Sequence, residues 1–259
     1  MIQAVGGVRP RSVRQVAPGV TLEEGTFQGA RYHLLRLDRR QARVEPRPHL
    51  SPRNWGQTVS QMGRETGALA ALNGTFFWAA PAGLATAGEV KNDRVAVRPW
   101  MLKKRTYYAM TPEGRLHMGE TEPLGRDSQG RPLWGIPLPT WQSFRYVLGG
   151  GGRLIRDGVK ASLGAGHNDE EFLPDVLARR NRSAVGFTAD GGTWLLAACD
   201  EPGWTPQQTA DFMLAQGAHQ AMFLDGGGST TMVVQGRVVN ELSQGQERRV
   251  PTALVLTSG

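Results

Sequence analysis

Turn-forming residues divide much of this 259-residue chain into pieces too short for long helices. Between about residues 80 and 165, glycine and proline recur every few positions, and the stretches between them, such as 107–110 and 115–118, are the length of strands. Short strands bounded by turn residues are typical of antiparallel hairpins. This pattern therefore predicts sheet joined by turns and long loops, with a flexible turn at the glycine run that begins at 149, and it argues against a mainly helical protein.

The last hundred residues contain the clearest helix signal. Thr205 suits the N-cap, Pro206 the first helical position, Gln208 completes a capping box, and Gly217 ends the pattern. A weaker helical pattern covers 54–66 and ends at Gly67, and apolar segments at 183–188, 193–198 and 253–257 predict strands. We therefore predict an α+β fold, a single domain with a mixed, largely antiparallel sheet and a few packed helices. Residues 1–18 are predicted to be a flexible leader, which leaves 19–259 as the domain.

Composition and charge exclude several classes of protein. Hydrophobic residues make up 39% of the chain, but no segment reaches the roughly 20 apolar residues of a membrane helix, so no membrane insertion is expected. The net charge of +7 comes mainly from arginines spread along the chain, without a basic stripe or a recognition motif. We therefore expect no nucleic-acid partner. A polyanion binder is kept as an alternative, because a positive field attracts anionic polymers and phosphates.

The residues that usually hold metals are few and badly spaced. The five histidines lack metal-ligand spacing, and Cys199 is the only cysteine and follows an apolar run. The sequence therefore predicts no metal, no cofactor and no internal disulfide, with Cys199 buried. The first residues contain no apolar stretch like that of a secretory signal, so the compartment stays open, as does the oligomeric state. The tryptophans Trp78, Trp100, Trp134 and Trp141 either stack on sugars or fill core, and none is assigned to a site.

The strongest local signal is LDGGGSTTM at 224–232. A carboxylate follows an apolar segment, and glycines and hydroxyls follow the carboxylate. Glycines let backbone N–H groups approach an anion and hydroxyls add donors, so the loop suits a phosphate or phosphodiester. A glycine-rich hairpin in which the aspartate only forms a turn is the alternative. The residues concerned are Asp225, Gly226, Gly227, Gly228, Ser229 and Thr230.

Two other polar residues adjoin predicted buried strands. Asn73 lies in ALNGTFF, where a helix, a glycine, an apolar strand and an Asn-Gly pair repeat the order found around Asp225. This repeat predicts that Asn73 and Asp225 occupy equivalent strand ends, although Asn-Gly is also an ordinary turn signal. Arg182 opens the apolar segment 183–187. A buried arginine needs an anionic partner, which is either an internal carboxylate or a bound phosphate.

Several separated motifs together resemble one known family. In order they are ALNGTFF (71–77), GGGRLIRDG (150–158), RSAVGF (182–187), LDGGGSTTM (224–232), VVN (238–240) and ERRV (247–250). Over about residues 20–257 the chain is similar to the catalytic domain of the uncovering enzyme family, the N-acetylglucosamine-1-phosphodiester α-N-acetylglucosaminidases and bacterial exopolysaccharide-biosynthesis relatives. Thr75 stands where relatives often have glycine.

The resemblance implies a phosphodiester glycosidase, which hydrolyses the bond between a sugar's anomeric carbon and a phosphodiester in a phosphate-containing glycan. It implies catalytic roles for Asp225, Asn73 and Arg182, phosphate contacts from the glycine, serine and threonine loop and from Arg248, and an extracytoplasmic location if a signal has been removed. Glu247 and Arg248 alone fit an ordinary surface pair. The main alternative is a non-catalytic polysaccharide-binding or exopolysaccharide assembly module. The carboxylates considered as a second catalytic group are Glu89, Asp200 and Glu247.

Overall fold

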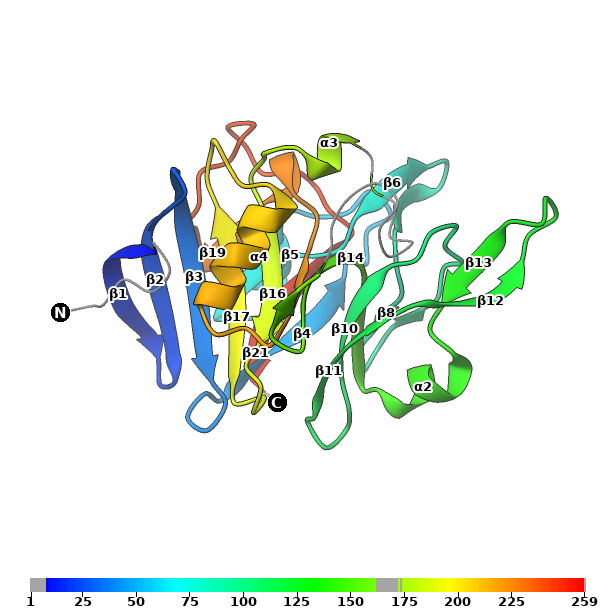
Figure 1. Ribbon diagram of the computed structural model, residues 1–259, viewed down its shortest axis with the longest axis horizontal. Coiled ribbons are helices and arrows are strands. Elements are labelled where there is room, and N and C mark those ends of the chain that lie inside the picture. Colours follow the sequence, from blue (N-terminus) through cyan, green and yellow to red (C-terminus); the bar gives the residue numbers. More distant parts are fainter. Residues whose placement is uncertain (1–7, 162–171, 173, 259) are drawn as a thin grey trace.

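The computed structural model describes residues 8–161, 172 and 174–258, which form a mainly β protein (Figure 1). Four α-helices occur among these residues, so the part of the chain described contains more sheet than an α+β description suggests. The helices are α1 (Val59–Glu65), α2 (Leu138–Ser143), α3 (Pro174–Leu177) and α4 (Pro206–Ala215). None of the described helices is both long and apolar enough to cross a membrane.

Most strands belong to two large sheets. The 12-stranded sheet has the order β1-β2-β3-β17-β16-β18-β14-β10-β11, with β8, β9 and β15 attached to it, and the five-stranded sheet has the order β20-β19-β5-β21-β4. The pairs β6-β7 and β12-β13 stand apart. Every strand pairing in the described ranges is antiparallel, so the expected mixed sheet is corrected to several antiparallel sheets.

The strands of the 12-stranded sheet are β1 (Arg9–Ala17), β2 (Val20–Phe27), β3 (Ala30–Asp38), β8 (Val90–Lys91), β9 (Ala96–Val97), β10 (Thr106–Met110), β11 (Leu116–Glu120), β14 (Tyr146–Arg156), β15 (Val159–Lys160), β16 (Ser183–Phe187), β17 (Thr193–Cys199) and β18 (Gln220–Phe223). Those of the five-stranded sheet are β4 (Val44–Leu50), β5 (Ala70–Asn73), β19 (Met232–Val234), β20 (Arg237–Val238) and β21 (Thr252–Ser258). The separate pairs are β6 (Phe77–Ala80) with β7 (Gly83–Thr86), and β12 (Glu122–Arg126) with β13 (Pro132–Gly135).

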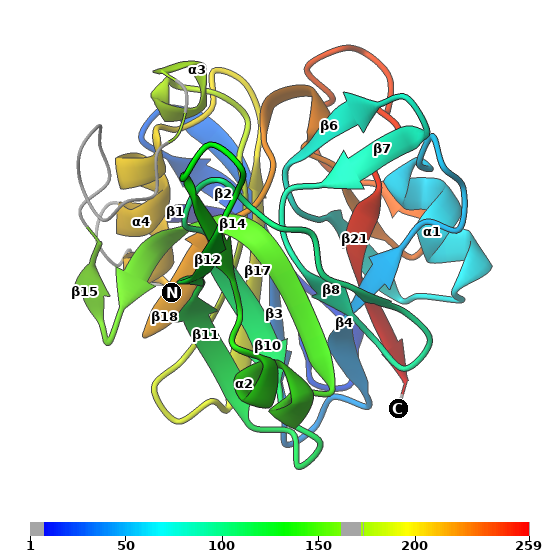
Figure 2. The same cartoon turned by 90° about the vertical axis from the view of Figure 1, so that its right-hand side faces the viewer.

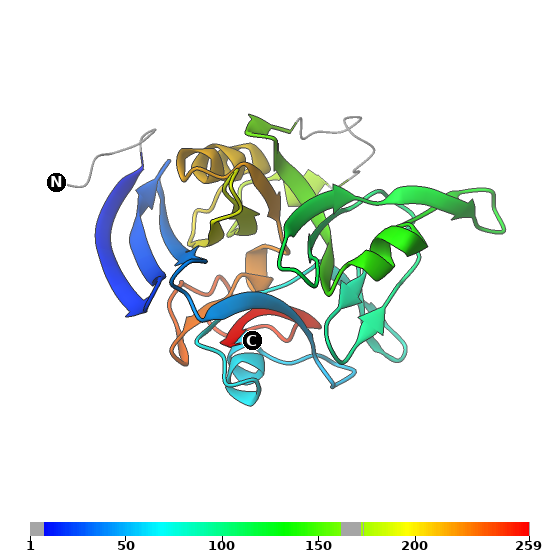
Figure 3. The same cartoon turned by 90° about the horizontal axis from the view of Figure 1, so that it is seen from below.

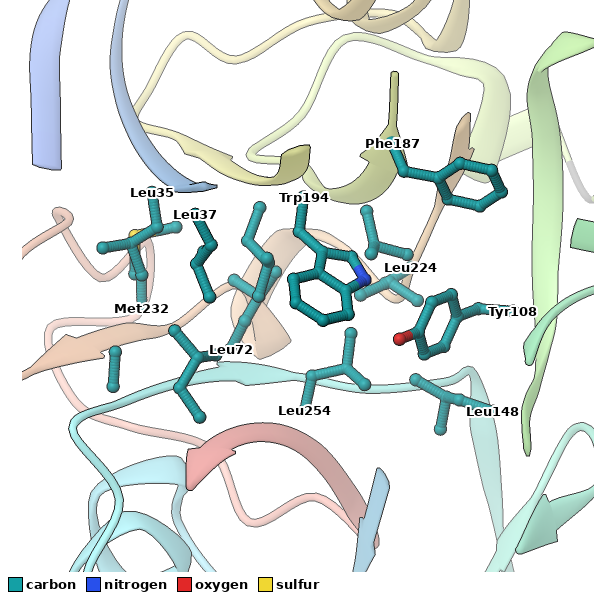
Figure 4. Packing of buried hydrophobic residues seen from close by; sticks show 14 of the residues in the cluster. Leu35, Leu37, Leu72, Tyr108, Leu148, Phe187, Trp194, Leu224, Met232 and Leu254 are labelled. Atoms are coloured by element: carbon teal, nitrogen blue, oxygen red, sulfur yellow. The ribbon is translucent and has the colours of Figure 1, made fainter. Parts of the chain in front are cut away.

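The main hydrophobic core lies between the two large sheets (Figure 4). Leu35 and Trp194 from one sheet meet Leu72 and Leu254 from the other, and all four are buried. Burying a leucine side chain contributes roughly 2 kcal/mol, so this interface fixes how the sheets face each other. It thereby also fixes the relative positions of β5 and β18, which come from different sheets.

A helix covers the outer face of each sheet, which gives a layered molecule (Figure 3). On the 12-stranded sheet, α4 packs through Phe212 against Tyr32, with ring centroids 4.8 Å apart. On the five-stranded sheet, α1 packs through Val59 and Met62. Cys199 lies in the core beneath α4, and burial raises the pKa of its thiol to about 12, as expected for a structural cysteine.

The capped helix is confirmed at α4. The Thr205 hydroxyl accepts the N–H of Gln208 at 3.2 Å, and the Gln208 side chain accepts the N–H of Thr205 at 2.9 Å. Helix α1 begins at residue 59, not near 54, because Thr58 and Gln61 form a second capping box there. The glycines predicted to end these helices, Gly67 and Gly217, both have positive φ.

Two segments expected to be flexible are strands. Residues 9–17, part of the expected leader, form β1 and pair with β2, with Val16 buried at the core. The glycines at 149–152, expected to form a turn, lie inside β14, which pairs with β10 in its first half and β18 in its second. Gly150 sits at the register shift with φ +89°, and a Cβ there would lie 2.0 Å from the Thr75 hydroxyl. The glycines therefore let β14 bend around the segment that carries Thr75.

Strand β4 forms one edge of the five-stranded sheet and contains Pro46 and Pro48. The Tyr108 hydroxyl donates to the carbonyl of Pro46 at 3.4 Å, and the Asn92 amide donates to that of Pro48 at 3.0 Å. Because N–H and C=O of one strand residue point the same way, both prolines occupy outward-facing positions. These positions have no N–H to offer, and each of their carbonyls has a partner within the chain.

Candidate active site

The main chain at Asp225 is held between the two sheets. Asp225 follows β18, and its N–H donates to the carbonyl of Gly74 at 3.1 Å, just after β5. The preceding N–H, of Leu224, donates to the carbonyl of Ser183 at 2.8 Å, in β16. The start of the Asp225 loop, residues 225–231, is therefore fixed by the ends of strands from both sheets.

Asn73 ties these strand ends together. Its side-chain N–H donates to the carbonyl of Asp225 at 2.8 Å, and its oxygen accepts the Ser183 hydroxyl at 2.6 Å and the N–H of Thr231 at 3.2 Å. Asn73 is fully buried, so its amide serves the protein interior. The repeat that paired Asn73 with Asp225 thus indicated a real proximity, but the structure gives Asn73 a positioning contact to the loop.

Each of the three glycines in the loop is required for a different steric reason. Gly227 has φ +57°, in the left-handed region. A methyl group at Gly226 would lie 2.8 Å from the backbone oxygen of Asn181, and one at Gly228 would lie 2.6 Å from Nη2 of Arg248. The glycines therefore permit the turn and the close approach of neighbouring groups.

Most backbone N–H groups of this loop are already used inside the protein. The N–H of Gly226 donates to Oδ1 of Asp225 at 2.9 Å, that of Gly227 to the carbonyl of Asn181 at 2.9 Å, and those of Ser229 and Thr230 to loop carbonyls. Within the loop 225–231, only the N–H of Gly228 has no hydrogen-bond partner in the part of the chain that the structure describes. The loop therefore does not present the converging set of free N–H groups that the sequence suggested.

Asp225 is half-buried as a residue, and its carboxyl group has an unusual acidity. Burial raises the pKa of Asp225 to about 6. Hydrogen bonds from the Ser229 hydroxyl and the Gly226 N–H, and the charges of Arg248 and Arg182, act in the opposite direction. A carboxyl that titrates near neutrality, with a polar and cationic surround, is suited to proton transfer or to charge stabilisation.

Arg248 reaches the loop from the segment before β21. Its Nη1 donates to the Ser229 hydroxyl at 3.4 Å, and its Nη2 lies next to Gly228. Ser229 is buried, whereas Arg248 is half-buried. Ser229 therefore links Asp225 to Arg248, which brings a positive charge to the loop.

Arg182 is almost completely buried and has no carboxylate partner among the described residues. Its guanidinium donates to the backbone carbonyls of Trp204 at 3.0 Å, of Val176 in α3 and of Ala178 directly after α3. Its remaining Nη1 lies beside Gly226. Burial lowers the pKa of Arg182 to about 10, so it keeps its charge at neutral pH. Arg182 thus anchors the α3 segment and directs one N–H group towards the loop.

The three carboxylates considered as partners of Asp225 each have another contact. Oε2 of Glu247 accepts the N–H of Ser60 at 3.0 Å in the first turn of α1. Oδ2 of Asp200 lies 3.1 Å from Nε2 of His33, and its Oδ1 accepts the N–H of Glu241 at 2.8 Å. Glu89 is buried against the N–H of Ile136. Each of the three therefore has a structural partner away from the Asp225 loop.

Sequence reasoning missed several residues that support the site. Arg180 is exposed; its aliphatic stem lies beside Gly227, and its guanidinium is directed to Asp175. Asn181 holds Gly227 through its carbonyl, and Asn240 donates to the carbonyl of Thr230 at 3.0 Å. Arg180 and Asn181 precede Arg182 directly, so the adjoining motif was the only available signal. Asn240 lay within the VVN motif, which suggested no particular contact.

Buried hydroxyls that have no hydrogen-bond partner among the described residues gather around the same loop. Thr230 and Thr231 lie in it, and Thr75 lies between Gly74 and the bend of β14. Buried polar groups are normally hydrogen-bonded, so unpaired ones mark places where water or a ligand completes the structure. Thr230, which the sequence assigned to phosphate binding, is in this group. Two cavities in the described structure, of about 430 and 680 Å³, are lined by residues elsewhere.

Comparison with known proteins places the chain in context. The sequence profile described as phosphodiester glycosidase matches residues 66–257. An uncharacterised protein derived from the SPβ prophage of Bacillus subtilis strain 168, YomE, is 32% identical over 88 residues, which are 32% of this chain and 14% of that protein. The chain therefore spans only a small part of this relative.

Solved structures share the fold. A hypothetical protein from Synechocystis matches with a TM-score of 0.65 and 16% identity over 93% of this chain and 62% of its own. The catalytic domain of zebrafish N-acetylglucosamine-1-phosphodiester α-N-acetylglucosaminidase, auto-inhibited by its pro-peptide, matches with a TM-score of 0.64 and 19% identity over 99% of this chain and 87% of its own. At such identities these likenesses concern the fold alone. The profile match covers most of the chain, including every residue of the Asp225 loop, and the chain therefore belongs to the phosphodiester glycosidase family.

Proposed function

We propose that this protein hydrolyses the bond between the anomeric carbon of a sugar and a phosphodiester, and releases free sugar and a phosphomonoester. The observation that carries the proposal is the carboxyl of Asp225, whose pKa is raised to about 6 and which is linked through Ser229 to Arg248. Family membership supports the reaction class. The substrate is a sugar phosphodiester within a phosphate-containing glycan.

In the proposed reaction the bond between the anomeric carbon and the phosphate oxygen breaks, and its electrons leave with the phosphate. Asp225 in its ionised form takes a proton from the attacking water or stabilises the positive charge that develops on the sugar. A phosphate is already a good leaving group, so it needs charge stabilisation more than protonation. Arg248 supplies that charge, and Arg182 adds to it from below Gly226.

Some residues of the proposed site contact the substrate, and others position those residues. Asp225, Gly228 and Arg248 are the contacting residues. Asn73, Ser229 and Arg182 hold the loop, since all three are buried and bonded within the chain. An extracytoplasmic location is part of this proposal, and a similar structure, from Burkholderia pseudomallei K96243, is described as that of a putative exported protein.

Hydrolysis of a panel of sugar-1-phosphodiesters by the wild type and by Asp225→Asn tests the proposal. We expect turnover by the wild type and a loss of about 100-fold or more in kcat for the variant, with unchanged circular dichroism. Saturable binding of the panel by both proteins, without turnover by either, would instead identify a non-catalytic polysaccharide-binding module. Binding that weakens steeply with salt and ignores the loop substitution would identify a general polyanion binder.

A further inference from the structure

The β6-β7 hairpin, together with the residues that flank it, contains no charged residue. From Thr75 to Gly88 the sequence is TFFWAAPAGLATAG, which has no Asp, Glu, Lys, Arg or His. Trp78, Ala79, Pro81 and Ala82 of this segment are nevertheless exposed. Exposed apolar surface of this kind usually marks a place where something binds.

The hairpin grows directly out of the candidate site. Gly74 accepts the N–H of Asp225, and the next residues lead into β6. In two perpendicular views the hairpin lies at the same edge of the molecule as the loop that follows β18 (Figure 2). A residue on the hairpin can therefore contact a substrate whose reacting bond lies at Asp225.

The two faces of the hairpin have different surroundings. Phe77 and Leu84 belong to one face: Phe77 packs on the cluster around Val59 of α1, and Leu84 lies against Gly56. Phe76 belongs to the other face and packs edge-on against Phe223 of β18, with ring centroids 5.9 Å apart. Phe223 is two residues before Asp225, so this second face adjoins the site.

Strand alternation places Trp78 on the second face. The N–H of Ala87 donates to the carbonyl of Phe76 at 2.7 Å, so the ladder of β6 and β7 extends back to Phe76. Side chains two residues apart in a strand point to the same side, and Trp78 therefore shares the face of Phe76. Its cross-strand partner is Ala85, and Trp78 itself is 45% exposed. The indole ring thus has small neighbours and an open face.

We propose that Trp78 is a sugar-binding residue that stacks against a pyranose ring of the substrate, next to the phosphodiester held at Asp225. This rests on the proposed function and names the residue that recognises the sugar. A pyranose presents an apolar face of C–H groups, which an uncharged indole with open space above it accommodates, and ligand sites commonly combine such aromatic walls with a few polar groups. The hairpin offers no cation to an anionic lipid, which makes a membrane a poorer occupant.

The test compares Trp78→Ala and Trp78→Phe with Trp100→Ala, an exposed tryptophan on a different segment that serves as the matched control. With a sugar-1-phosphodiester, we expect Trp78→Ala to raise KM about tenfold with little change in kcat. Trp78→Phe should restore most of the affinity, and Trp100→Ala should match the wild type. Inhibition by dimethyl phosphate, which has no sugar, should be the same in all four proteins.

A second measurement keeps this inference separate from the reaction. Methyl glycosides of several hexoses and N-acetylhexosamines should change the tryptophan fluorescence of the wild type and of Asp225→Asn, but not that of Trp78→Phe. Turnover by Trp78→Ala with an unchanged KM would overturn the sugar-binding role of Trp78 and would leave the proposed function standing. Glycoside binding that depends on Trp78, without turnover by the wild type, would support the sugar-binding role and overturn the proposed function. Absence of both glycoside binding and turnover in the wild type would overturn the sugar-binding role. Binding of the wild type to anionic vesicles that is lost in Trp78→Ala would also overturn it.

Discussion

The side-chain amide of Asn73 donates to the backbone carbonyl of Asp225 across 2.8 Å, although 152 positions separate the two residues in sequence. The bond joins the end of β5, in one sheet, to the residues after β18, in the other. The same amide oxygen accepts two further hydrogen bonds, so the geometry of the Asp225 loop depends on one buried side chain.

Replacing Asn73 should therefore cost both stability and activity. Asn73→Ala leaves the Ser183 hydroxyl and the Asp225 carbonyl without their partner, which should lower the free energy of unfolding by about 2 to 4 kcal/mol in urea denaturation. Adding Ser183→Ala removes one of the two groups left without a partner. The double variant should therefore lose less free energy of unfolding than the sum of the losses in the two single variants. Strict additivity would contradict the shared network.

The raised pKa of Asp225 predicts a gain in stability when its charge is removed. A carboxyl whose pKa is higher in the folded state than in the unfolded state weakens folding as pH rises from about 4 to about 6. Asp225→Asn should therefore raise the free energy of unfolding by about 2 kcal/mol at pH 7.5 and change it little at pH 4. In the exposed turn residue Asp190, a hydrogen bond from Thr188 lowers the pKa. Asp190→Asn should bring no such gain, and an equal gain in both variants would refute the assignment.

The pH dependence of turnover should report the same group. If ionised Asp225 acts as the base or the charge stabiliser, kcat/KM should fall about tenfold per pH unit below about 6. The positive charge of Arg248 lowers this pKa. Arg248→Gln should therefore move the acidic limb of the pH–activity profile to higher pH, and it should also weaken substrate binding. Activity that falls as pH rises through 6 would show instead that the protonated form of Asp225 is required.

Gly228 offers a substitution that affects function more than folding. A methyl group there meets only the ends of the Arg248 and Gln244 side chains, which can move, so Gly228→Ala should fold with a loss of less than about 1 kcal/mol. It should nonetheless lower kcat/KM at least tenfold by displacing Arg248. Gly226→Ala meets the backbone oxygen of Asn181 and should be clearly less stable. Gly125→Ala, which meets nothing, is the neutral control for thermal melting and kinetics.

Sequence patterns predicted the local elements better than the contacts between them. The capping box of Thr205 and the apolar strands depend on neighbouring residues, and the structure contains both. The proximity of Asn73 and Asp225 followed from a repeated order of elements. The carbonyl partners of Arg182 did not, because they depend on how α3 packs over the start of β16. The bend of β14 at Gly150 was likewise hidden, since a glycine run in sequence is equally typical of a loop.

The hydrogen-bonding capacity of the glycine motif could not be predicted from its sequence alone. Three glycines next to an aspartate suggested a set of free N–H groups, yet the N–H groups of Gly226 and Gly227 are bonded to Asp225 and Asn181. Whether a backbone donor is free depends on acceptors that are distant in sequence. The positive charges of Arg182 and Arg248 beside Asp225 became visible only when the segments before β16 and before β21 were seen to converge on one loop.

The prolines of β4 bear on whether these molecules can join through their sheets. An extended segment from a neighbouring copy needs a row of N–H and C=O groups with which to pair. Pro46 and Pro48 have no N–H group. The carbonyl of Pro46 already accepts a hydrogen bond from Tyr108, and that of Pro48 accepts one from Asn92. The opposite border of the same sheet is β20, which is only two residues long. A protein so rich in strand thus resists growth of this sheet into fibrils at either border.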